Sequence, residues 1–201
     1  LYANKKAVKD KKITAEIWIQ HLWLSDQEYE KKGTLIKWKP AVKSVEDRAA
    51  LWKAILNDKN DVIASDHAPH ALEEKSNTYT KATSGGPLVQ HALVAMMEAH
   101  HNGKITIEKM VEKMCHNPAI LFQIEKRGYI KEGYFADLVL VNPNNPWTVN
   151  KDNILYKCAW SPFEGSTFKS RVTHTILNGT VVYENAKFTN QKAAMRLTFN
   201  R

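Results

Sequence analysis

Short apolar runs alternate with stretches of helical spacing over roughly the first two thirds of the chain. The runs ITAEIWI at 13–19 and VIA at 62–64 are brief and rich in β-branched residues, which favours strands, the second buried on both faces. Apolar residues recur at helical spacing in 44–56, 86–103 and 106–116. Because strands that alternate with helices are typical of parallel α/β folds, the pattern predicts that class.

Capping and turn residues set the expected ends of these helices. Ser44 and Asp47 have capping-box spacing at the start of the first. Pro87 falls in the first turn of the second, and Gly103 closes it. The pair Asn117-Pro118 is expected to end the third, since proline cannot continue a helix. The expected apolar faces consist of Val45, Ala49, Trp52, Ile55 and Leu56 in the first helix and of Val89, Leu93 and Met96 in the second.

The pattern changes after Gly128, where β-branched residues dominate. The segments 128–143 and 171–188 both read as strands, and Asn178-Gly179 is a typical tight turn between two of them. This part predicts a separate β layer or small sandwich. We therefore divide the chain into an α/β part, 1–127, and a β-rich part, 128–201.

Composition is that of a globular chain with one sizeable core: 201 residues, of which 43% are hydrophobic and 25% charged. The net charge of +8 is compatible with an acidic partner such as nucleic acid or a small anion. The lysines are dispersed, however, and no nucleic-acid-binding signature is present, so nucleic acid is a distant alternative. No apolar run is long enough to span a membrane or to form a signal peptide, which makes a cytoplasmic location the default. Cys115 and Cys158 are expected to be buried free thiols.

Candidate chemistry is concentrated in VIASDHAPH, residues 62–70. Asp66, His67 and His70 follow directly on the predicted strand. In α/β folds the carboxyl ends of strands line the crevice where catalytic side chains and ligands gather. The motif therefore predicts a site, although an aspartate that caps a helix would occur in the same place.

Several further motifs, in this order and spacing, give the chain a family resemblance. They are SDHAPH with EEK shortly after it, the Gly-Gly-Pro turn at 85–87, HNPA at 116–119, GYIKEGYFADLVLV at 128–141 and WSPFEG at 160–165. Together they resemble the dihydroorotases, cyclic amidohydrolases of pyrimidine biosynthesis, over about residues 13–188. The resemblance implies the C-terminal part of a zinc-dependent (β/α)₈ TIM barrel with strands of a small β-sandwich. It also implies the reversible hydrolysis of dihydroorotate to N-carbamoyl-aspartate, with zinc activating the attacking water.

The resemblance implies roles for three side chains. Asp66 matches the aspartate of the last barrel strand, which binds the more buried of two zinc ions and carries a proton from the attacking hydroxide to the leaving nitrogen. His70 matches a histidine that contacts the substrate near its carboxylate and carbonyl groups. Lys39 stands where many relatives have asparagine, and its charge could pair with the substrate carboxylate. A solvated surface lysine is the alternative at that position.

Four other residues are implicated near the same site. Gly85 and Gly86 would bring backbone groups close to the substrate, since glycine permits close approach, although a plain loop-to-helix turn also explains them. Glu16 and His21 match positions that bind an additional zinc in some relatives, and a structural role is the alternative. His67 matches no family role and is expected to be a loop residue.

The family's remaining metal ligands have no counterpart in this sequence. The His-X-His pair, the bridging carboxylated lysine and two further histidines would all precede Leu1, and a two-metal site needs several ligands per ion. One interpretation is the C-terminal half of a longer enzyme, completed by its N-terminal half and forming homo-oligomers, with 1–12 as the tail of a helix. A second is a truncated, non-catalytic chain that acts by association. A hydantoinase or allantoinase is the third, because these share the fold and the strand-end aspartate.

Overall fold

The computed structural model describes residues 10 and 13–200, so the predicted helix tail at 1–12 lies, apart from Asp10, outside the described residues. Two short parallel strands, β1 (Glu16–Trp18) and β2 (Val62–Ala64), form the centre of the α/β part. β2 has the predicted bounds. β1 is shorter than the predicted 13–19, because Ile19 already begins a helix that buries both Ile19 and Leu22.

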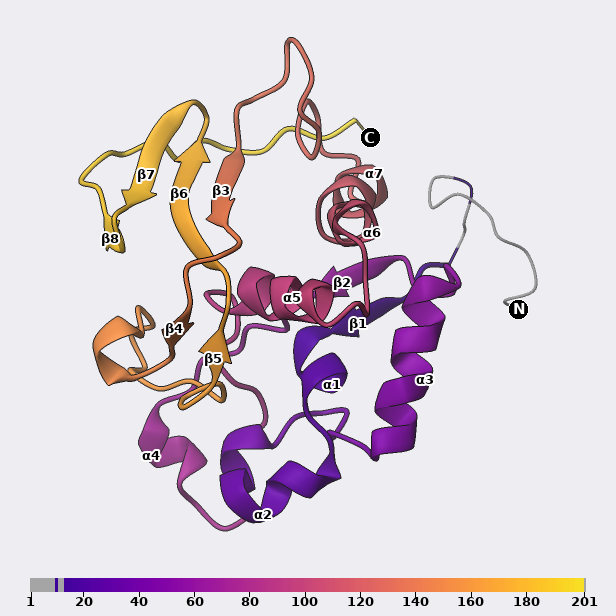
Figure 1. Cartoon of the computed structure of the whole chain (residues 1–201), viewed down its shortest axis with the longest axis vertical. Coiled ribbons are helices and arrows are strands. Elements are labelled where there is room, and N and C mark those ends of the chain that lie inside the picture. The colour runs from indigo at the N-terminus through magenta and orange to yellow at the C-terminus, as the bar shows by residue number, and fades with distance from the viewer. Residues whose placement is uncertain (1–9, 11–12, 201) are drawn as a thin grey trace.

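Short helices surround this strand pair (Figure 1). The α-helices are α1 (Ile19–Trp23), α2 (Tyr29–Lys32), α3 (Val45–Leu56), α4 (Leu72–Lys75), α5 (Ala92–His101), α6 (Ile107–Val111) and α7 (Asn117–Leu121). One π turn, Glu112–His116, joins α6 to α7, and 3-10 turns span Asp26–Glu28, Gly33–Ile36 and Lys151–Asn153. The structure is therefore mixed α/β, as predicted. No helix among the described residues is long and apolar enough to cross a membrane.

Helix α3 begins as predicted, and part of its expected apolar face is buried. The Ser44 hydroxyl accepts a hydrogen bond from the Asp47 backbone N–H at 3.2 Å, which confirms the capping box. Ala49 and Leu56 are exposed, against the prediction. Trp52 and Ile55 point inward as predicted, and the Trp52 indole N–H donates to the Leu22 carbonyl at 3.0 Å. The bond anchors this face against α1, while the outer positions 49 and 56 stay in contact with solvent.

Helix α5 begins at Ala92, six residues later than the predicted start at Gly86, so Pro87 precedes the helix. The cause is a tertiary contact: the backbone N–H groups of Leu88 and Val89 donate to His67 Nδ1, at 3.0 and 3.3 Å. These donors hold 86–91 in a loop, and Val89 is exposed rather than part of an apolar face. The predicted end is confirmed, since Gly103 follows the helix with a φ of +68° that glycine tolerates.

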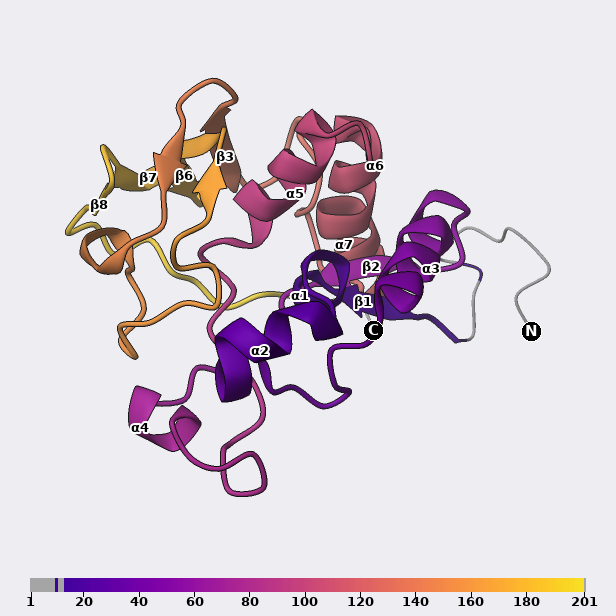
Figure 2. The ribbon, with the colours of Figure 1, turned by 60° about the horizontal axis from the view of Figure 1, so that its bottom comes forward.

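The helix at 106–116 continues through Asn117-Pro118, against the prediction. The Asn117 N–H bonds to the Glu112 carbonyl, the longer i→i−5 contact of a π turn. This wider turn leads into α7 and accommodates Pro118, which has no N–H to donate, near the start of that helix. α6, the π turn and α7 therefore form one continuous rod (Figure 2).

A four-stranded antiparallel sheet forms the β-rich part, in the order β3-β6-β7-β8. Asn178 and Gly179, with φ values of 50° and 81°, make the predicted tight turn between β6 and β7. A separate two-stranded pair, β4-β5, lies beside it (Figure 1). The strand bounds are β3 (Leu138–Asn142), β4 (Trp147–Thr148), β5 (Thr167–Phe168), β6 (Arg171–Leu177), β7 (Thr180–Glu184) and β8 (Lys187–Phe188).

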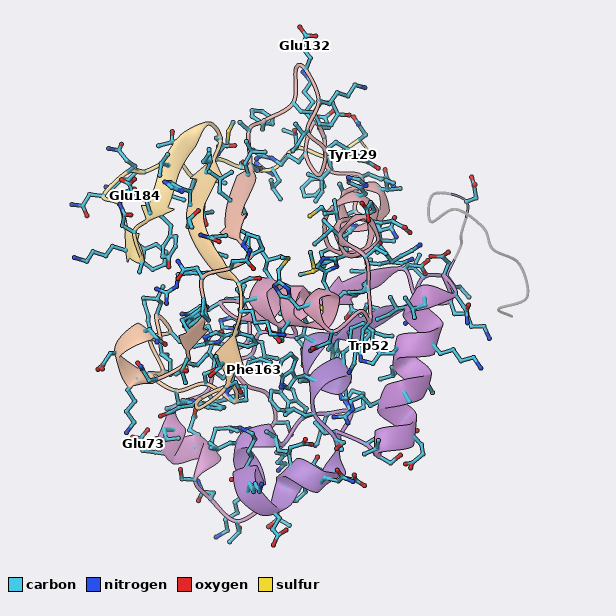
Figure 3. The ribbon with its side chains drawn as sticks, viewed as in Figure 1. Trp52, Glu73, Tyr129, Glu132, Phe163 and Glu184 are labelled. Atoms are coloured by element: carbon cyan, nitrogen blue, oxygen red, sulfur yellow. The ribbon has the colours of Figure 1, made fainter. Side chains whose placement is uncertain are left out.

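One hydrophobic cluster joins residues from both parts of the chain. It contains Trp38 and Met96 together with Phe163 and Phe168, all almost fully buried. Figure 3 shows Phe163 in the interior, with Glu73 and Glu184 at the periphery. The two cysteines are unpaired, as expected, but Cys115 is exposed and Cys158 partly so, because neither belongs to this cluster.

Candidate active site

Three chain segments far apart in the sequence meet at the carboxyl end of β2. The Ala68 N–H donates to the Gly86 carbonyl at 3.1 Å, and His67 and Gly86 form a parallel bridge. The Gly85 N–H donates to the Lys37 carbonyl at 2.9 Å. The segments 37–40, 66–70 and 84–89 therefore lie together, and these carry most of the side chains singled out from the sequence.

Asp66 lies two residues beyond β2 with a φ of 45°, a left-handed conformation that aspartate tolerates and that turns the chain sharply out of the strand. Its side chain is partly buried. Burial raises the pKa of this carboxyl, the negative charge of Glu16 raises it further, and His21 opposes the shift. A raised pKa makes the carboxylate a better proton acceptor, which suits a group that takes a proton and returns it.

Glu16 and His21 lie within electrostatic range of Asp66, one at the start of β1 and the other in α1. His21 Nε2 lies 3.0 Å from the Pro40 carbonyl and must carry a proton to bond it, and burial lowers the pKa of the ring. Glu16 is exposed and accepts a hydrogen bond from the Trp18 indole at 2.7 Å. The two residues flank Asp66 and already have partners of their own.

A zinc ion in a protein generally takes three or four His, Cys, Asp or Glu ligands. Within residues 10 and 13–200, no three such side chains are grouped so that they could hold a metal ion. The described residues on their own therefore do not complete a zinc site.

His70 is fixed from three sides. Its Nε2 lies 3.1 Å from the Ser84 carbonyl, its Nδ1 lies 3.5 Å from a carboxylate oxygen of Glu74, and its own carbonyl accepts the Trp160 indole N–H at 2.8 Å. Because a carbonyl only accepts, Nε2 must carry the proton. The ring is half-exposed, so its edge can still meet a ligand from the solvent side.

His67 has a loop role in this structure. Its Nδ1 accepts two backbone N–H groups, so that nitrogen is unprotonated, and burial lowers the pKa of the ring. The neutral ring packs 5.4 Å from the ring of Tyr156. We conclude that His67 shapes the loop before α5.

Gly85 and Gly86 lie where no larger residue fits. A Cβ on Gly85 would be 2.6 Å from Ala68 Cβ, and one on Gly86 would be 2.7 Å from the Trp38 ring. Gly85 also has a φ of +118°, which side chains rarely adopt. Both glycines are buried, while Lys39 nearby is exposed. The glycines are thus required by the packing of 66–70 on 84–86.

Sequence reasoning gave no role to Lys75, which is fully buried. Its ammonium donates to three backbone carbonyls, those of Lys37 at 3.2 Å, Thr83 at 3.0 Å and Gly85 at 2.7 Å. Burial and the charge of Lys37 lower the pKa of Lys75 to about 8. The lysine of the EEK motif was the only sequence signal for this role.

His91 was also missed. It is fully buried against Phe163 and Phe168, and burial lowers its pKa to about 4, so the ring is neutral. Its Nδ1 lies 3.1 Å from the Ser161 hydroxyl and 3.2 Å from the Tyr156 hydroxyl. This network joins the WSPFEG segment to the start of α5.

A fold of this kind with an aspartate at a strand end is typical of metal-dependent hydrolases, and comparison with known proteins agrees. The amidohydrolase family model matches residues 9–182, so the chain belongs to the amidohydrolase family. It is 38% identical over 185 residues to a dihydroorotase from Pyrococcus furiosus, covering 92% of this chain and 43% of that protein. A dihydroorotase from Clostridium acetobutylicum is 37% identical over 174 residues, 86% of this chain and 41% of the relative. These identities confirm the resemblance to dihydroorotases.

The solved structure of an L-hydantoinase (dihydropyrimidinase) from Arthrobacter aurescens is also similar, with a TM-score of 0.82 and 29% identity. The match covers 88% of this chain and 40% of that one. The chain therefore spans less than half the length of the relatives that it matches.

Proposed function

We propose that this chain is part of a dihydroorotase, which hydrolyses the cyclic amide of dihydroorotate to N-carbamoyl-aspartate and closes the ring in the biosynthetic direction. The observation that carries the reaction class is the partly buried Asp66 at the end of β2, whose pKa is raised by burial and by Glu16. The choice of substrate ring is supported by the higher identity to dihydroorotases, 38% against 29% for the hydantoinase.

In the proposed reaction Asp66 moves the proton. Its carboxylate takes a proton from the attacking water as the water oxygen bonds to the ring carbonyl carbon. The carbon–nitrogen bond then breaks, and Asp66 returns the proton to the leaving nitrogen, giving a ureido group and a new carboxylic acid, which loses its remaining proton to the solvent. His70 and the backbone of Gly85 and Gly86 would hold the substrate carboxylate and carbonyl groups.

The proposal includes the wider organisation expected from the family. The fold is the C-terminal part of a TIM barrel, 1–127, with strands of a β-sandwich, 128–201. The cofactor is zinc, with Asp66 as one ligand, Glu16 and His21 as candidates for an additional ion, and the other ligands outside the described residues. A homo-oligomer or an N-terminal half would complete the enzyme. The unpaired cysteines are compatible with a cytoplasmic location.

One experiment tests this function: the intact mass and metal content of the natural protein, followed by rates of ring opening with dihydroorotate and hydantoin. We expect a mass above 23.0 kDa, bound zinc and faster turnover of dihydroorotate. Faster turnover of hydantoin would instead identify a hydantoinase. No turnover of either ring by the intact, metal-loaded protein would favour a non-catalytic chain that acts by association.

Lys39→Ala is expected to raise KM for dihydroorotate about tenfold with little change in kcat, because a charge pair with the substrate carboxylate contributes to binding in the ground state and the transition state alike. Steady-state kinetics over a range of substrate concentrations checks it. The control is Lys53→Ala, which removes an exposed lysine of α3, away from Lys39, and should leave KM unchanged. If both variants have the wild-type KM, Lys39 is a surface lysine.

A further inference from the structure

The loop that carries Gly85 and Gly86 is held from beneath by a buried ammonium. Lys75, the last residue of α4, donates to the carbonyls of Thr83 and Gly85 in this loop. The same ammonium donates to the carbonyl of Lys37, two residues before Lys39. One side chain thus ties the loop to the segment that precedes Lys39.

All three polar contacts of the Lys75 ammonium are with backbone carbonyls. Within the part of the chain that the structure describes, no carboxylate lies within salt-bridge distance of it, and its burial is complete. An ammonium has three N–H donors, and here each has its own acceptor. The faces of the Trp38 and Trp160 rings lie 5.7 and 5.9 Å from Nζ and add a favourable cation–π contact.

A second lysine acts on the same loop. The Lys37 ammonium donates to the carbonyls of Tyr79 and Ala82, which precede residues 83–86 in the chain. It also lies 4.9 Å from the centroid of the Tyr79 ring. Lys37 and Lys75 are both buried, and the charge of Lys37 contributes to the lowered pKa of Lys75. Because burying two like charges is costly, the separate carbonyl contacts of the two lysines along 79–85 point to a requirement on the position of this segment.

We propose that Lys75 is a positioning residue of the candidate active site, which fixes the loop 83–86 against 37–40 and 66–70 so that the Ser84 carbonyl holds the His70 ring in place. This rests on the proposed function for the identity of the substrate, whereas the loop contacts are independent of it. Lys75 is fully buried and therefore acts only through the loop. With a pKa of about 8 the side chain is predominantly the three-donor ammonium at neutral pH.

The first test is hydrogen exchange of the full-length protein at neutral pH, measured by mass spectrometry. Lys75→Met removes the donors and approximately keeps the length of the side chain. Lys81→Met, at an exposed lysine two residues before the loop, is the control. We expect exchange in 83–86 to rise about tenfold or more in Lys75→Met alone, with the β6–β7 hairpin unchanged. Unchanged exchange in 83–86, or an equal rise across the whole chain, would overturn the proposal.

A second measurement applies to the wild-type protein and does not require the variant to fold. Nitrogen-15 spectra of the lysine side chains should contain one slowly exchanging ammonium that couples through hydrogen bonds to the carbonyl carbons of Thr83 and Gly85. If every lysine ammonium exchanges as fast as a solvated one, the three-carbonyl contact does not exist and the proposal fails.

Kinetics separates this proposal from the proposed function. If dihydroorotate is the substrate, Lys75→Met should raise KM about tenfold and change kcat much less, since the loop holds His70, which binds the substrate and does not move the proton. If the wild-type protein opens no dihydroorotate, the proposed function fails, while the exchange and ammonium measurements still decide whether Lys75 positions the loop.

Discussion

Asp66→Asn is expected to lower the rate of dihydroorotate ring opening by about a thousandfold or more, because the amide cannot take the proton from the attacking water or return it to the leaving nitrogen. The substitution keeps the size of the side chain. It also removes a negative charge that burial and Glu16 disfavour, so the melting temperature of the metal-free protein should not fall.

The control for this variant is Glu73→Gln, which neutralises an exposed carboxylate on α4 a few residues away. It should keep the wild-type rate. Circular dichroism and thermal melts would show that both variants are folded. Turnover of Asp66→Asn within a few-fold of wild type would mean that another group moves the proton and that Asp66 has a structural role at the end of β2.

Local chemistry explains what could be predicted of the fold. The capping box at Ser44 and Asp47 and the hairpin turn at Asn178-Gly179 each depend on two adjacent or nearly adjacent residues, so the sequence contains the whole cause. The strand β2 was found for a similar reason, since its β-branched residues are bounded by polar ones. These elements need no knowledge of the rest of the molecule.

The errors at the two prolines come from specific hydrogen bonds that the local sequence pattern does not reveal. Nothing near Pro87 in the sequence reveals that His67 accepts the N–H groups of the next two residues and delays α5. Likewise, nothing in the sequence reveals that the Asn117 N–H donates to the Glu112 carbonyl, the i→i−5 hydrogen bond of the π turn. Pro87 was expected in the first turn of a helix, and Pro118 was expected to end one. In each case a specific hydrogen bond produced a different structure.

The residues of the candidate site also fall into those that the sequence revealed and those that only the structure revealed. Asp66 and His70 belong to one short motif, and a motif is visible in the sequence. Lys75 belongs to the motif region too, but its role depends on carbonyls of residues 37, 83 and 85, and backbone acceptors leave no mark on the sequence. A lysine is usually solvated, so its burial had to be seen.

Gly85→Ala should be among the most damaging single substitutions in this chain. The new Cβ would lie 2.6 Å from Ala68 Cβ and 3.1 Å from the Ala68 carbonyl oxygen, and these atoms cannot move aside while the Ala68 N–H bonds Gly86. The left-handed backbone adds about 1–2 kcal/mol of strain, and overpacking adds about 1–3 kcal/mol. We therefore expect a large loss of stability and, because 84–86 must separate from 66–70, a fall in kcat/KM of about a hundredfold or more.

Gly133→Ala separates these two costs. Gly133 also has a positive φ, +78°, but a Cβ there meets nothing within 4 Å, so only the backbone strain remains, about 1–2 kcal/mol. Urea unfolding of both variants gives the difference in free energy, and steady-state kinetics gives the effect on turnover. Equal destabilisation by the two substitutions would show that 66–70 and 84–86 are not in close contact, and the candidate site as described would then be wrong. A larger loss for Gly85→Ala, with kcat/KM falling only in that variant, would place the contact between the two loops at the centre of substrate binding.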